Sequence, residues 1–410
     1  MRRIYHTALL LFLFVGIARA QETSEAPFTD YLREQQIPVT QNNIVTLLMN
    51  GHDKFADLFS EVRRARHHIH LEYFNFRNDS IANALFDLLE EKAREGVKVR
   101  AIFDDFGNWS NNQPLKKQHL KRIRERGIEI VKFDPIKFPY LNHIMHRDHR
   151  KIVVIDGQIG YTGGMNVADY YIHGLPKIGQ WHDIHIRIDG EATRYLQGIF
   201  LTMWNKATKQ HIGGPEYFPP ILPYPDSLTQ VVAIVDRTPV ETPRSISRAY
   251  TAAIHAAREN IQIVNPYFVP TKSIRKALKD ALKRGTEVEI MIPSVSDIPF
   301  TPEASFHVVH QLMKKGAKVY LFNGGFHHAK IMMIDRTFCT VGTANLDSRS
   351  LRYDYETNAF IFDGSTTGQL NRMFERDKHN SILLTPDVWK QRSPWKKFVG
   401  WVGNLMTPFL

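Results

Sequence analysis

Hydrophobic residues in the first half of the chain follow two spacings in turn. Apolar positions three or four residues apart predict helices, and short runs rich in branched and aromatic residues predict strands. The expected helices cover residues 55–66, 80–95 and 115–126, and the expected strands cover residues 68–74, 97–103 and 128–133. Gly96 and Gly127 directly follow two of these helices, where a glycine commonly ends a helix.

The second half of the chain repeats this order of elements. The expected helices cover residues 245–258, 273–284 and 303–315, and the expected strands cover residues 261–264, 287–292 and 317–322. Gly285 and Gly316 lie at one constant offset from Gly96 and Gly127, so the repeat extends to the helix ends. Alternating helices and strands predict an α/β protein with a mostly parallel sheet in each half.

A polar motif interrupts each half at the start of a further apolar run. Its form is His-x-Lys-x4-Asp, and both copies have identical spacing. The first copy is His149, Lys151 and Asp156, and the second is His328, Lys330 and Asp335. Each copy is followed at equal distances by a glycine and an asparagine, namely Gly163 and Asn166 in the first half and Gly342 and Asn345 in the second. A lone histidine beside a strand is usually structural, but two matching sets of five positions indicate a shared function.

The spacing inside the motif indicates its geometry. Four apolar residues between Lys and Asp predict a buried strand, and alternation along a strand directs His149 and Lys151 to one face. The Gly-Gly and Gly-Thr pairs downstream predict turns where backbone approaches a ligand closely. A neutral histidine and a lysine beside exposed backbone N–H groups suit a phosphate. Two such faces brought together would surround one phosphorus.

The paired motif resembles that of the phospholipase D superfamily. The resemblance implies an α/β fold of two pseudo-symmetric α-β-α lobes with one active site at their interface. It also implies that one histidine attacks phosphorus to form a phosphohistidine while the other protonates the leaving alcohol. Family precedent favours His149 as the nucleophile and His328 as the acid and base, but the symmetry of the two motifs alone does not assign these roles. The resemblance implies no metal and no cofactor, and the sequence itself shows no set of residues with metal-ligand spacing.

The same resemblance suggests roles for the remaining polar residues. Lys151 and Lys330, with Asn166 and Asn345, are expected to hold the non-bridging oxygens of the phosphate, and Asp156 and Asp335 to support the site structurally. A carboxylate in the strand after each motif is expected to orient a histidine. Asp183 and Glu356 match that position, and solvated strand ends are the alternative reading.

Several segments are more specifically similar to bacterial cardiolipin synthases. They cover residues 69–74, 104–107, 146–151, 265–270, 344–350 and the C-terminal tail. The similarity implies transfer of a phosphatidyl group between two phosphatidylglycerol molecules. A phospholipase D that hydrolyses phospholipid, a nuclease of the superfamily and a non-enzymatic binding scaffold are the alternatives. Because both motifs are intact and the chain has lipid-like features, the nuclease and the scaffold are disfavoured.

The composition and charge of the chain indicate which classes of partner it can bind. The net charge of +11 and the pI near 9.5 favour an anionic partner, either nucleic acid or an acidic lipid surface, with solubility as the alternative explanation. Phosphatidylglycerol, other anionic phospholipids and a membrane surface fit the lipid reading, whereas a nucleic acid is not expected and no protein partner is inferred. The apolar content of 43% excludes a disordered chain. The single cysteine, Cys339, excludes an internal disulfide and is expected to be buried.

The two ends of the chain indicate export and a lipid interface. Arg2 and Arg3, the apolar run 8–18 and the Ala18-x-Ala20 pattern predict a cleaved signal peptide, with an uncleaved anchor as the alternative. Ser393 and Pro394 predict the start of a helix. Its apolar residues fall on one face, at Trp395, Phe398, Val399, Val402, Leu405, Met406 and Phe409. That helix either lies in a membrane interface or packs on the protein's own core.

These features divide the chain into segments. The expected segments are a signal peptide 1–20, a linker 21–45, an N-terminal domain 46–212, a Pro-rich linker 213–228, a C-terminal domain 229–385 and an amphipathic tail 386–410. The expected location is the periplasmic face of a bacterial inner membrane, to which the exported protein binds peripherally.

Overall fold

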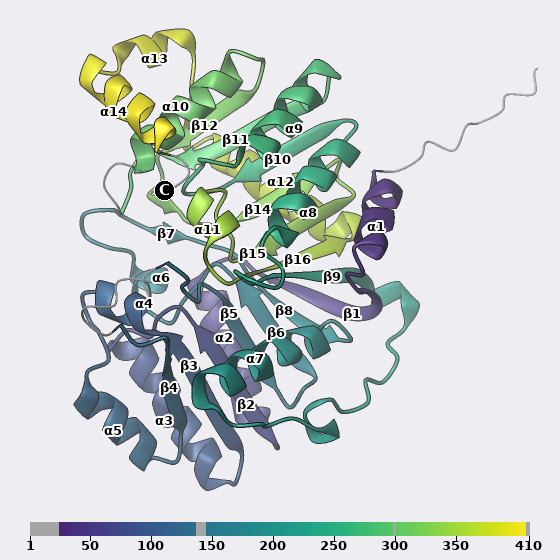
Figure 1. The fold of residues 1–410 in the computed structure, drawn as a ribbon, viewed down its shortest axis with the longest axis vertical. Helices are drawn as coiled ribbons and strands as arrows, with labels where there is room; N and C mark the ends of the chain where they lie inside the picture. The colour runs from purple at the N-terminus through teal and green to yellow at the C-terminus, as the bar shows by residue number, and fades with distance from the viewer. Residues whose placement is uncertain (1–23, 137–144, 298–300, 407–410) are drawn as a thin grey trace, which may run out of the picture.

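The computed structural model describes residues 24–136, 145–297 and 301–406 (Figure 1). The expected signal peptide 1–20 and Phe409 lie outside these ranges. None of the helices in the described ranges combines the length and the apolar character that a bilayer crossing requires.

Each half contains three parallel strands, as the alternating pattern predicts. In the first half they are β2 (His68–Tyr73), β3 (Lys98–Asp104) and β4 (Glu129–Phe133), with helices α2 (Gly51–Arg64), α3 (Ser80–Arg94) and α5 (Lys117–Glu125). In the second they are β10 (Asn260–Val264), β11 (Glu287–Pro293) and β12 (Lys318–Phe322), with helices α8 (Ser245–Ala256), α9 (Lys272–Lys283) and α10 (Thr301–Met313). All twelve predicted elements are confirmed to within a few residues at each end.

The prediction of a mostly parallel sheet is wrong for the rest of each half. The motif strands β5 (Lys151–Ile155) and β14 (Ile331–Ile334) are buried, as predicted, but pair antiparallel with β2 and β10 and with the strands that follow them. The antiparallel strands downstream are β6 (Ile159–Gly163) and β8 (His185–Gly190) in the first half and β15 (Phe338–Gly342) and β16 (Glu356–Phe362) in the second. The motif aspartates reverse the chain, since Asp156 and Asp335 both adopt positive φ at hairpin turns.

Within the expected linker 21–45, residues from 24 onward are not the irregular segment that the sequence suggests. Residues Glu25–Glu34 form helix α1, and Val39–Leu48 form strand β1, which pairs with β8 of the first half and with β9 (Gln230–Arg237) of the second. The polar residues of β1 do not predict a strand, because the sequence does not show that one of their amide side chains is buried and hydrogen-bonded within the protein. Asn43 is buried and its side chain contacts Gln230, Thr40 and the backbone of Ala192.

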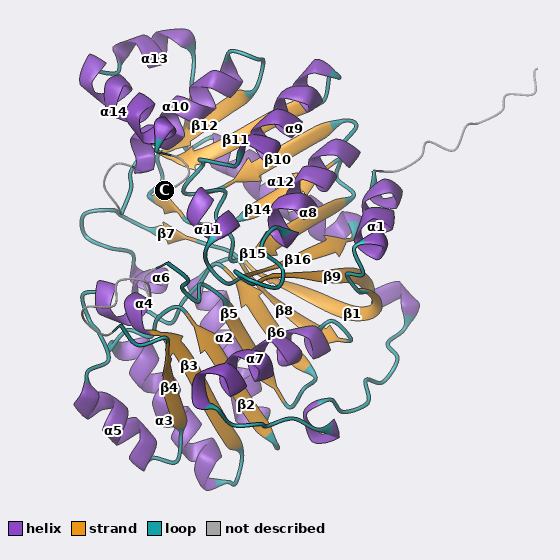
Figure 2. Cartoon of the chain, viewed as in Figure 1, coloured by secondary structure: helices purple, strands orange, loops and turns teal. Residues whose placement is uncertain are grey.

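Strand β1 makes one continuous sheet of the two halves. The sheet has 15 strands in the order β17-β12-β11-β10-β14-β15-β16-β9-β1-β8-β6-β5-β2-β3-β4, where β17 is Ser381–Leu383. Helices α7 (Thr193–Thr208) and α12 (Gly364–Lys378) contribute to one apolar core on one face of this sheet. Figure 2 shows the strands fanning through the molecule with helices on both faces. The expected domain boundaries stay a prediction.

Candidate active site

The backbone of each motif pairs with a segment of the opposite half. The His149 N–H donates to the Tyr355 carbonyl (3.0 Å), and the Tyr355 N–H donates to the Arg147 carbonyl (2.8 Å). In the second motif the His328 N–H donates to the His182 carbonyl (2.7 Å), next to the parallel pair β7 (Trp181–His182) and β13 (Phe326–His327). Both histidines therefore lie where the two halves meet.

The two expected carboxylates contact the two histidines in a crossed arrangement. His149 Nδ1 lies 2.9 Å from Glu356 Oε1, and His328 Nδ1 lies 2.7 Å from Asp183 Oδ2. Each histidine is thus held by a carboxylate from the other half. Both carboxylates are buried, so they are not solvated strand ends. The contact at Nδ1 leaves Nε2 as the ring nitrogen that can react.

Burial sets the protonation of the histidines. It lowers the pKa of His149 to about 4, although Glu356 opposes the shift. Burial also lowers the pKa of His328 well below its usual value, and the nearby charges of Lys330 and Lys151 lower it further. Both imidazoles are therefore neutral at pH 7.

The two carboxylates are ionised at the same pH. Burial raises the pKa of Asp183 to about 6, which remains below neutrality. Burial alone would raise the pKa of Glu356, but His149 and Lys151 outweigh it and the pKa is lowered. A neutral imidazole beside an ionised carboxylate donates from Nδ1, so Nε2 carries a free electron pair.

The two motif lysines are buried beside the histidines, and no carboxylate of the described residues forms an ion pair with either of them. Lys151 Nζ donates to the His149 carbonyl and Lys330 Nζ to the His328 carbonyl, each at 2.5 Å. Burial lowers the pKa of Lys151 to about 7 and that of Lys330 to about 8. The nearby carboxylates of Glu356 and Asp183 only partly oppose these shifts, and an anion bound between the two ammonium groups would oppose them further.

The motif aspartates lie at the opposite ends of the motif strands from the histidines. The Asp156 carboxylate accepts hydrogen bonds from the backbone N–H groups of residues 66, 67 and 68 at 2.8–2.9 Å. The Asp335 carboxylate does the same with residues 258, 259 and 260 at 2.7–2.8 Å. Both aspartates therefore fix the chain entering a neighbouring strand, which agrees with the structural role expected for them, and among the described residues neither is hydrogen-bonded to His149 or His328.

The glycines after each motif lie against the strand that carries the carboxylate of the same half, and approach of a ligand to their backbone stays a prediction. A Cβ atom at Gly164 would lie 2.1 Å from Asp183 Oδ1, and one at Gly342 would lie 2.3 Å from the Asn358 side chain. Their backbone N–H groups are also used internally, because Gly164 donates to Ile184 and Gly342 donates to Lys330. The glycines let the strand that carries the carboxylate pass close to the motif.

One asparagine follows the glycines of each motif. Asn166 and Asn345 are buried, and the Asn166 side-chain oxygen accepts a hydrogen bond from the Asn75 N–H at 3.4 Å. In the described part of the chain, Asn345 Oδ1 has no hydrogen-bond partner. Their contact with phosphate oxygens stays a prediction.

Sequence reasoning missed residues that surround the motifs. The ring of His328 lies 5.3 Å from Trp181 and 5.6 Å from Phe326, whereas the ring of His149 lies 5.0 Å from Phe74. Lys54 is fully buried and donates to the Asn166 backbone carbonyl at 3.0 Å. No sequence pattern singles these residues out, because aromatic residues and a lysine on an amphipathic helix are ordinary features of a fold.

Asp104 is the last residue of β3, and Asp105 directly follows it. The Asp104 carboxylate lies 2.9 Å from the Arg147 guanidinium, and both side chains are fully buried. Asp105 pairs with Lys132 at 2.6 Å. Among the described residues, no three His, Cys, Asp or Glu side chains are grouped to hold a metal ion. The buried ion pair instead positions the chain two residues before His149.

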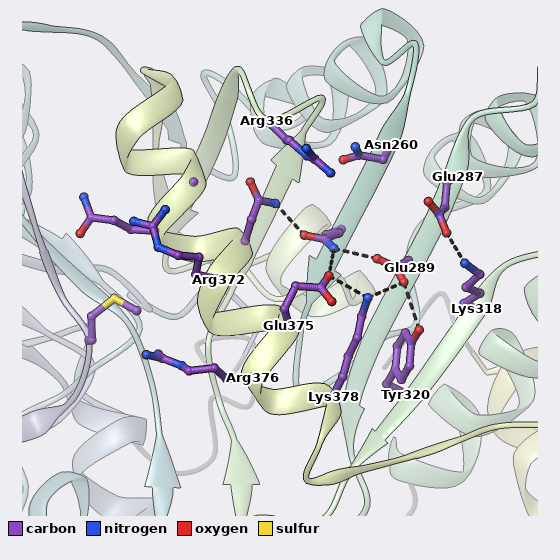
Figure 3. Close-up of a pocket in the computed structure, with 15 residues that line it drawn as sticks. Asn260, Glu287, Glu289, Lys318, Tyr320, Arg336, Arg372, Glu375, Arg376 and Lys378 are labelled. Atoms are coloured by element: carbon purple, nitrogen blue, oxygen red, sulfur yellow. Dashed lines mark hydrogen bonds and ion pairs between the residues drawn. The ribbon is translucent and has the colours of Figure 1, made fainter.

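A polar cleft of about 880 Å³ lies away from the motifs, against α12 and strands β10, β11 and β12 (Figure 3). Its lining includes Glu289, which contacts Gln262, Tyr320 and Lys378. It contains none of the histidines, lysines or carboxylates of the crossed arrangement. Cys339 is also remote from reaction chemistry, since it is buried and its pKa is raised to about 12 by burial.

Comparison with known proteins identifies the family. Residues 58–204 and 250–378 match the family described as cardiolipin synthase, PLD-like domain. A cardiolipin synthase from Listeria monocytogenes is 36% identical over 375 residues, which cover 91% of this chain and 76% of the relative. Cardiolipin synthase 1 from Staphylococcus epidermidis is 37% identical over 382 residues, which cover 92% of this chain and 76% of the relative.

A solved structure supports the same fold. The crystal structure of phosphatidylserine synthase from Haemophilus influenzae aligns with a TM-score of 0.68 at 12% identity and covers 93% of this chain and 99% of that chain. The likeness extends over both halves and confirms the two-lobed phospholipase D-like fold. Taken with the family match and the relatives, it shows that this chain belongs to the cardiolipin synthase family of phospholipase D-like proteins.

Proposed function

We propose that this protein is a cardiolipin synthase, a phosphatidyltransferase that moves the phosphatidyl group of one phosphatidylglycerol to a hydroxyl of another and releases glycerol. Relatives that carry this name align with more than nine-tenths of the chain. The single observation that carries the chemistry is the crossed pair of His–carboxylate contacts, because it brings both motifs into one site.

The first step forms a phosphohistidine. Nε2 of His149 attacks the phosphorus of phosphatidylglycerol, and the bond between phosphorus and the glycerol oxygen breaks as the N–P bond forms. His328 donates a proton to that oxygen, and glycerol leaves. The assignment of His149 as nucleophile follows family precedent. The Glu356 contact supports it, because a histidine that donates from Nδ1 has its Nε2 electron pair available.

The second step transfers the phosphatidyl group. A hydroxyl of a second phosphatidylglycerol attacks the phosphorus and gives its proton to His328. The N–P bond breaks, cardiolipin forms and His149 becomes neutral again. The proton that His328 donated in the first step thus returns, and no oxidant, reductant or net proton is required.

The negative charge of the substrate favours the protonated forms of the lysines and of His328 that these steps need. A phosphodiester anion between Lys151 and Lys330 raises their lowered pKa values, so both become cations as the lipid binds. The negative charge of the phosphodiester also favours protonation of His328 at Nε2, against the lysine charges that lower its pKa, so His328 takes up a proton from solvent as the lipid binds. Asn166 and Asn345 would complete the contacts to the non-bridging oxygens.

The test follows lipid products and free glycerol from the purified full-length protein and phosphatidylglycerol vesicles, with and without a chelator. Cardiolipin and glycerol in equal amounts, absent with His149→Ala, are the expected result. Phosphatidic acid with glycerol would instead make water the acceptor and the protein a hydrolase. No lipid turnover by the wild-type protein, with cleavage of a nucleic-acid phosphodiester, would favour the nuclease.

The proposed site of action is a membrane surface at the periplasmic face of a bacterial inner membrane. Two observations support it: the signal-like segment 1–20 and the exposed apolar residues of the C-terminal helix. Protease accessibility in spheroplasts tests the location. Digestion without membrane lysis is expected, and protection until lysis would place the catalytic halves on the cytoplasmic side.

A further inference from the structure

The C-terminal helix α14 (Pro394–Leu405) is packed on one side and exposed on the other. Ser393 caps it, as predicted, by accepting from the Lys396 N–H at 3.3 Å. Gly400 and Gly403 face α10 so closely that a Cβ atom at either position would lie 2.4 Å and 2.9 Å from Glu303 and Ala304. These glycines dock the helix against α10, which confirms packing on the protein, whereas a membrane interface for the other side of the helix stays a prediction.

The opposite side of α14 carries an exposed row of large apolar residues, here named the aromatic ridge. The aromatic ridge consists of Trp395, Phe398, Trp401, Leu405 and Met406. Its Trp395 is 70% exposed, and the Phe398 ring lies 5.7 Å and 6.1 Å from the rings of Trp395 and Trp401. Contiguous aromatic exposure of this kind marks an interaction surface, and tryptophans favour the lipid–water interface.

Positive charge continues from the end of the ridge. A cleft of about 620 Å³, here named the basic cleft, includes Leu405 and Asn404 of α14 in its lining. Its cations are Lys272, Arg275, Lys276, Lys279, Lys283 and Arg352, and its lining contains one carboxylate, Asp280. Arg275 joins the two features by donating to Asn404 at 2.7 Å. Helix α14 itself contains no acidic residue.

The aromatic ridge lies on the catalytic side of the molecule. Helix α10, which carries α14, follows the carboxyl end of β11, and β11 is the parallel neighbour of β10 beside the second motif. In the first half, α4 (Asp105–Ser110) likewise follows the carboxyl end of β3 and exposes 73% of Trp109. Figure 1 shows α4, α6 (Tyr170–His173), β7 and α14 along the same side of the molecule.

We propose that the aromatic ridge and the basic cleft together form the docking surface for an anionic phospholipid leaflet, with Trp109 as a second contact from the other half. Apolar side chains enter the interface while the cations meet lipid phosphates, which is the combination that interfacial helices use. Docking on this side turns the site between the two halves toward the leaflet. The proposal deepens the proposed function, because it states how that site reaches a lipid substrate.

Vesicle flotation of the full-length protein tests the docking surface directly. The variant carries Trp395→Ala, Phe398→Ala and Trp401→Ala, and its partition into vesicles of phosphatidylcholine mixed with phosphatidylglycerol should fall by about 10-fold or more. The matched control removes exposed apolar residues elsewhere through Leu222→Ala, Leu228→Ala and Val240→Ala. The control should change partition by less than about 2-fold. Equal partition of the wild-type protein and the ridge variant would overturn the proposal.

A charge variant tests the basic cleft separately. Lys272→Gln with Lys279→Gln should reduce the preference for vesicles that contain phosphatidylglycerol over pure phosphatidylcholine by about 5-fold or more. An unchanged preference would show that the cleft does not read lipid charge. If the wild-type protein sediments as a dimer, the ridge variant as a monomer, and both partition equally, the ridge is a contact between copies and the lipid proposal fails.

Activity on two forms of substrate separates this proposal from the proposed function. With monomeric short-chain phosphatidylglycerol, the ridge variant should match the wild-type protein within about 2-fold, while its rate on vesicles should fall with its partition. Absence of turnover by the wild-type protein on both forms would refute the proposed function while flotation still judges the docking surface. Equal loss on both forms would show that the ridge supports the fold, and would overturn its docking role.

Discussion

The two halves of the molecule share the same order of strands and helices, but they differ in what covers one face of their first parallel strand. Pairing of β2 with β5 and of β10 with β14 aligns His68 and His70 with Asn260 and Gln262. In the first half, the 3-10 turn Pro215–Tyr217 covers this face, and the Tyr217 ring lies 5.1 Å from His68 and 5.5 Å from His70. In the second half, the corresponding face is the open polar cleft of Figure 3.

The hairpin turns record the same difference. Gly157 follows the first motif aspartate, and a Cβ atom there would lie 2.5 Å from the Tyr217 carbonyl oxygen. The equivalent residue in the second half is Arg336, which adopts a positive φ of 59° and lines the open cleft. The repeat is therefore strict where the two halves share the site and relaxed on the outer faces, where each half has packed independently.

The largest expected effect concerns the two histidines. Replacing His149 or His328 with alanine should each lower kcat by about 10³-fold or more, because one loses the nucleophile and the other the acid and base. Product formation from phosphatidylglycerol is the measurement, with Cys339→Ser as a control outside the site. Loss with only one of the two variants would contradict a site shared equally by the halves.

The crossed carboxylates should come next. Glu356→Gln and Asp183→Asn should each lower kcat by roughly 10²–10⁴-fold, because each loses the anion that orients a histidine of the opposite half. Glu356→Gln should behave as a defect in His149, and Asp183→Asn as a defect in His328. Phosphoenzyme yield after acid quench separates them. Identical behaviour of the two variants would argue against the crossed assignment.

The hairpin residues should separate the halves in stability. Gly157→Ala should reduce the free energy of unfolding by about 2–4 kcal/mol, since the new Cβ meets the covering turn at a positive φ. Arg336→Gly should leave it within about 1 kcal/mol of the wild-type value, because glycine suits that backbone. Denaturant unfolding of both variants is the measurement. Equal losses would show that the cover on the first half is not the cause.

The motif lysines should give the pH profile an alkaline limb. In the proposed mechanism protonated lysine binds the phosphate, and burial lowers the pKa in the free protein to about 7 for Lys151 and about 8 for Lys330. Raising the pH through this range removes positive charge, so kcat/KM should fall by about 10-fold per pH unit above about pH 8. A flat profile between pH 7 and pH 9, with product formation intact, would show that the lysines keep their usual pKa.

The smallest expected effect concerns the covered histidines. Burial lowers the pKa of His68 to about 4 and that of His70 well below its usual value, whereas Asn260 and Gln262 do not titrate. Below about pH 6.5 these histidines bind protons in the unfolded chain but stay neutral in the folded state. Acid therefore lowers the free energy of unfolding of the first half. Hydrogen exchange, corrected for intrinsic rates, should show β2 losing about 2 kcal/mol of protection relative to β10 at pH 5. Equal losses would remove this distinction.

Much of the molecule can be predicted from sequence where local patterns coincide with the fold. Helix spacing and glycine ends locate the parallel units, and the motif locates both histidines and lysines. The position of Asp183 and Glu356 after each motif identifies the carboxylates, but the crossing depends on contacts between distant halves. No local pattern carries that information, because each carboxylate is close in sequence to the motif that it does not serve.

The errors have equally specific causes. The sequence does not predict strand β1, because Asn43 is polar yet buried, with its side chain hydrogen-bonded to backbone groups of other segments. The antiparallel pairing of the motif strands depends on hairpin turns at Asp156 and Asp335, which adopt positive φ. The spacing of apolar residues does not predict these backbone angles. Trp401 was left off the apolar face because Gly400 and Gly403, not the larger residues, dock α14.

The central claim is that both halves build one site in which His149 carries the phosphatidyl group. Acid quench of the full-length protein with phosphatidylglycerol labelled at phosphorus tests it most directly. The account predicts an acid-labile, base-stable phosphohistidine on the wild-type protein and on His328→Ala, and none on His149→Ala. Label that persists in His149→Ala and disappears in His328→Ala would contradict it and assign the nucleophile to the other half.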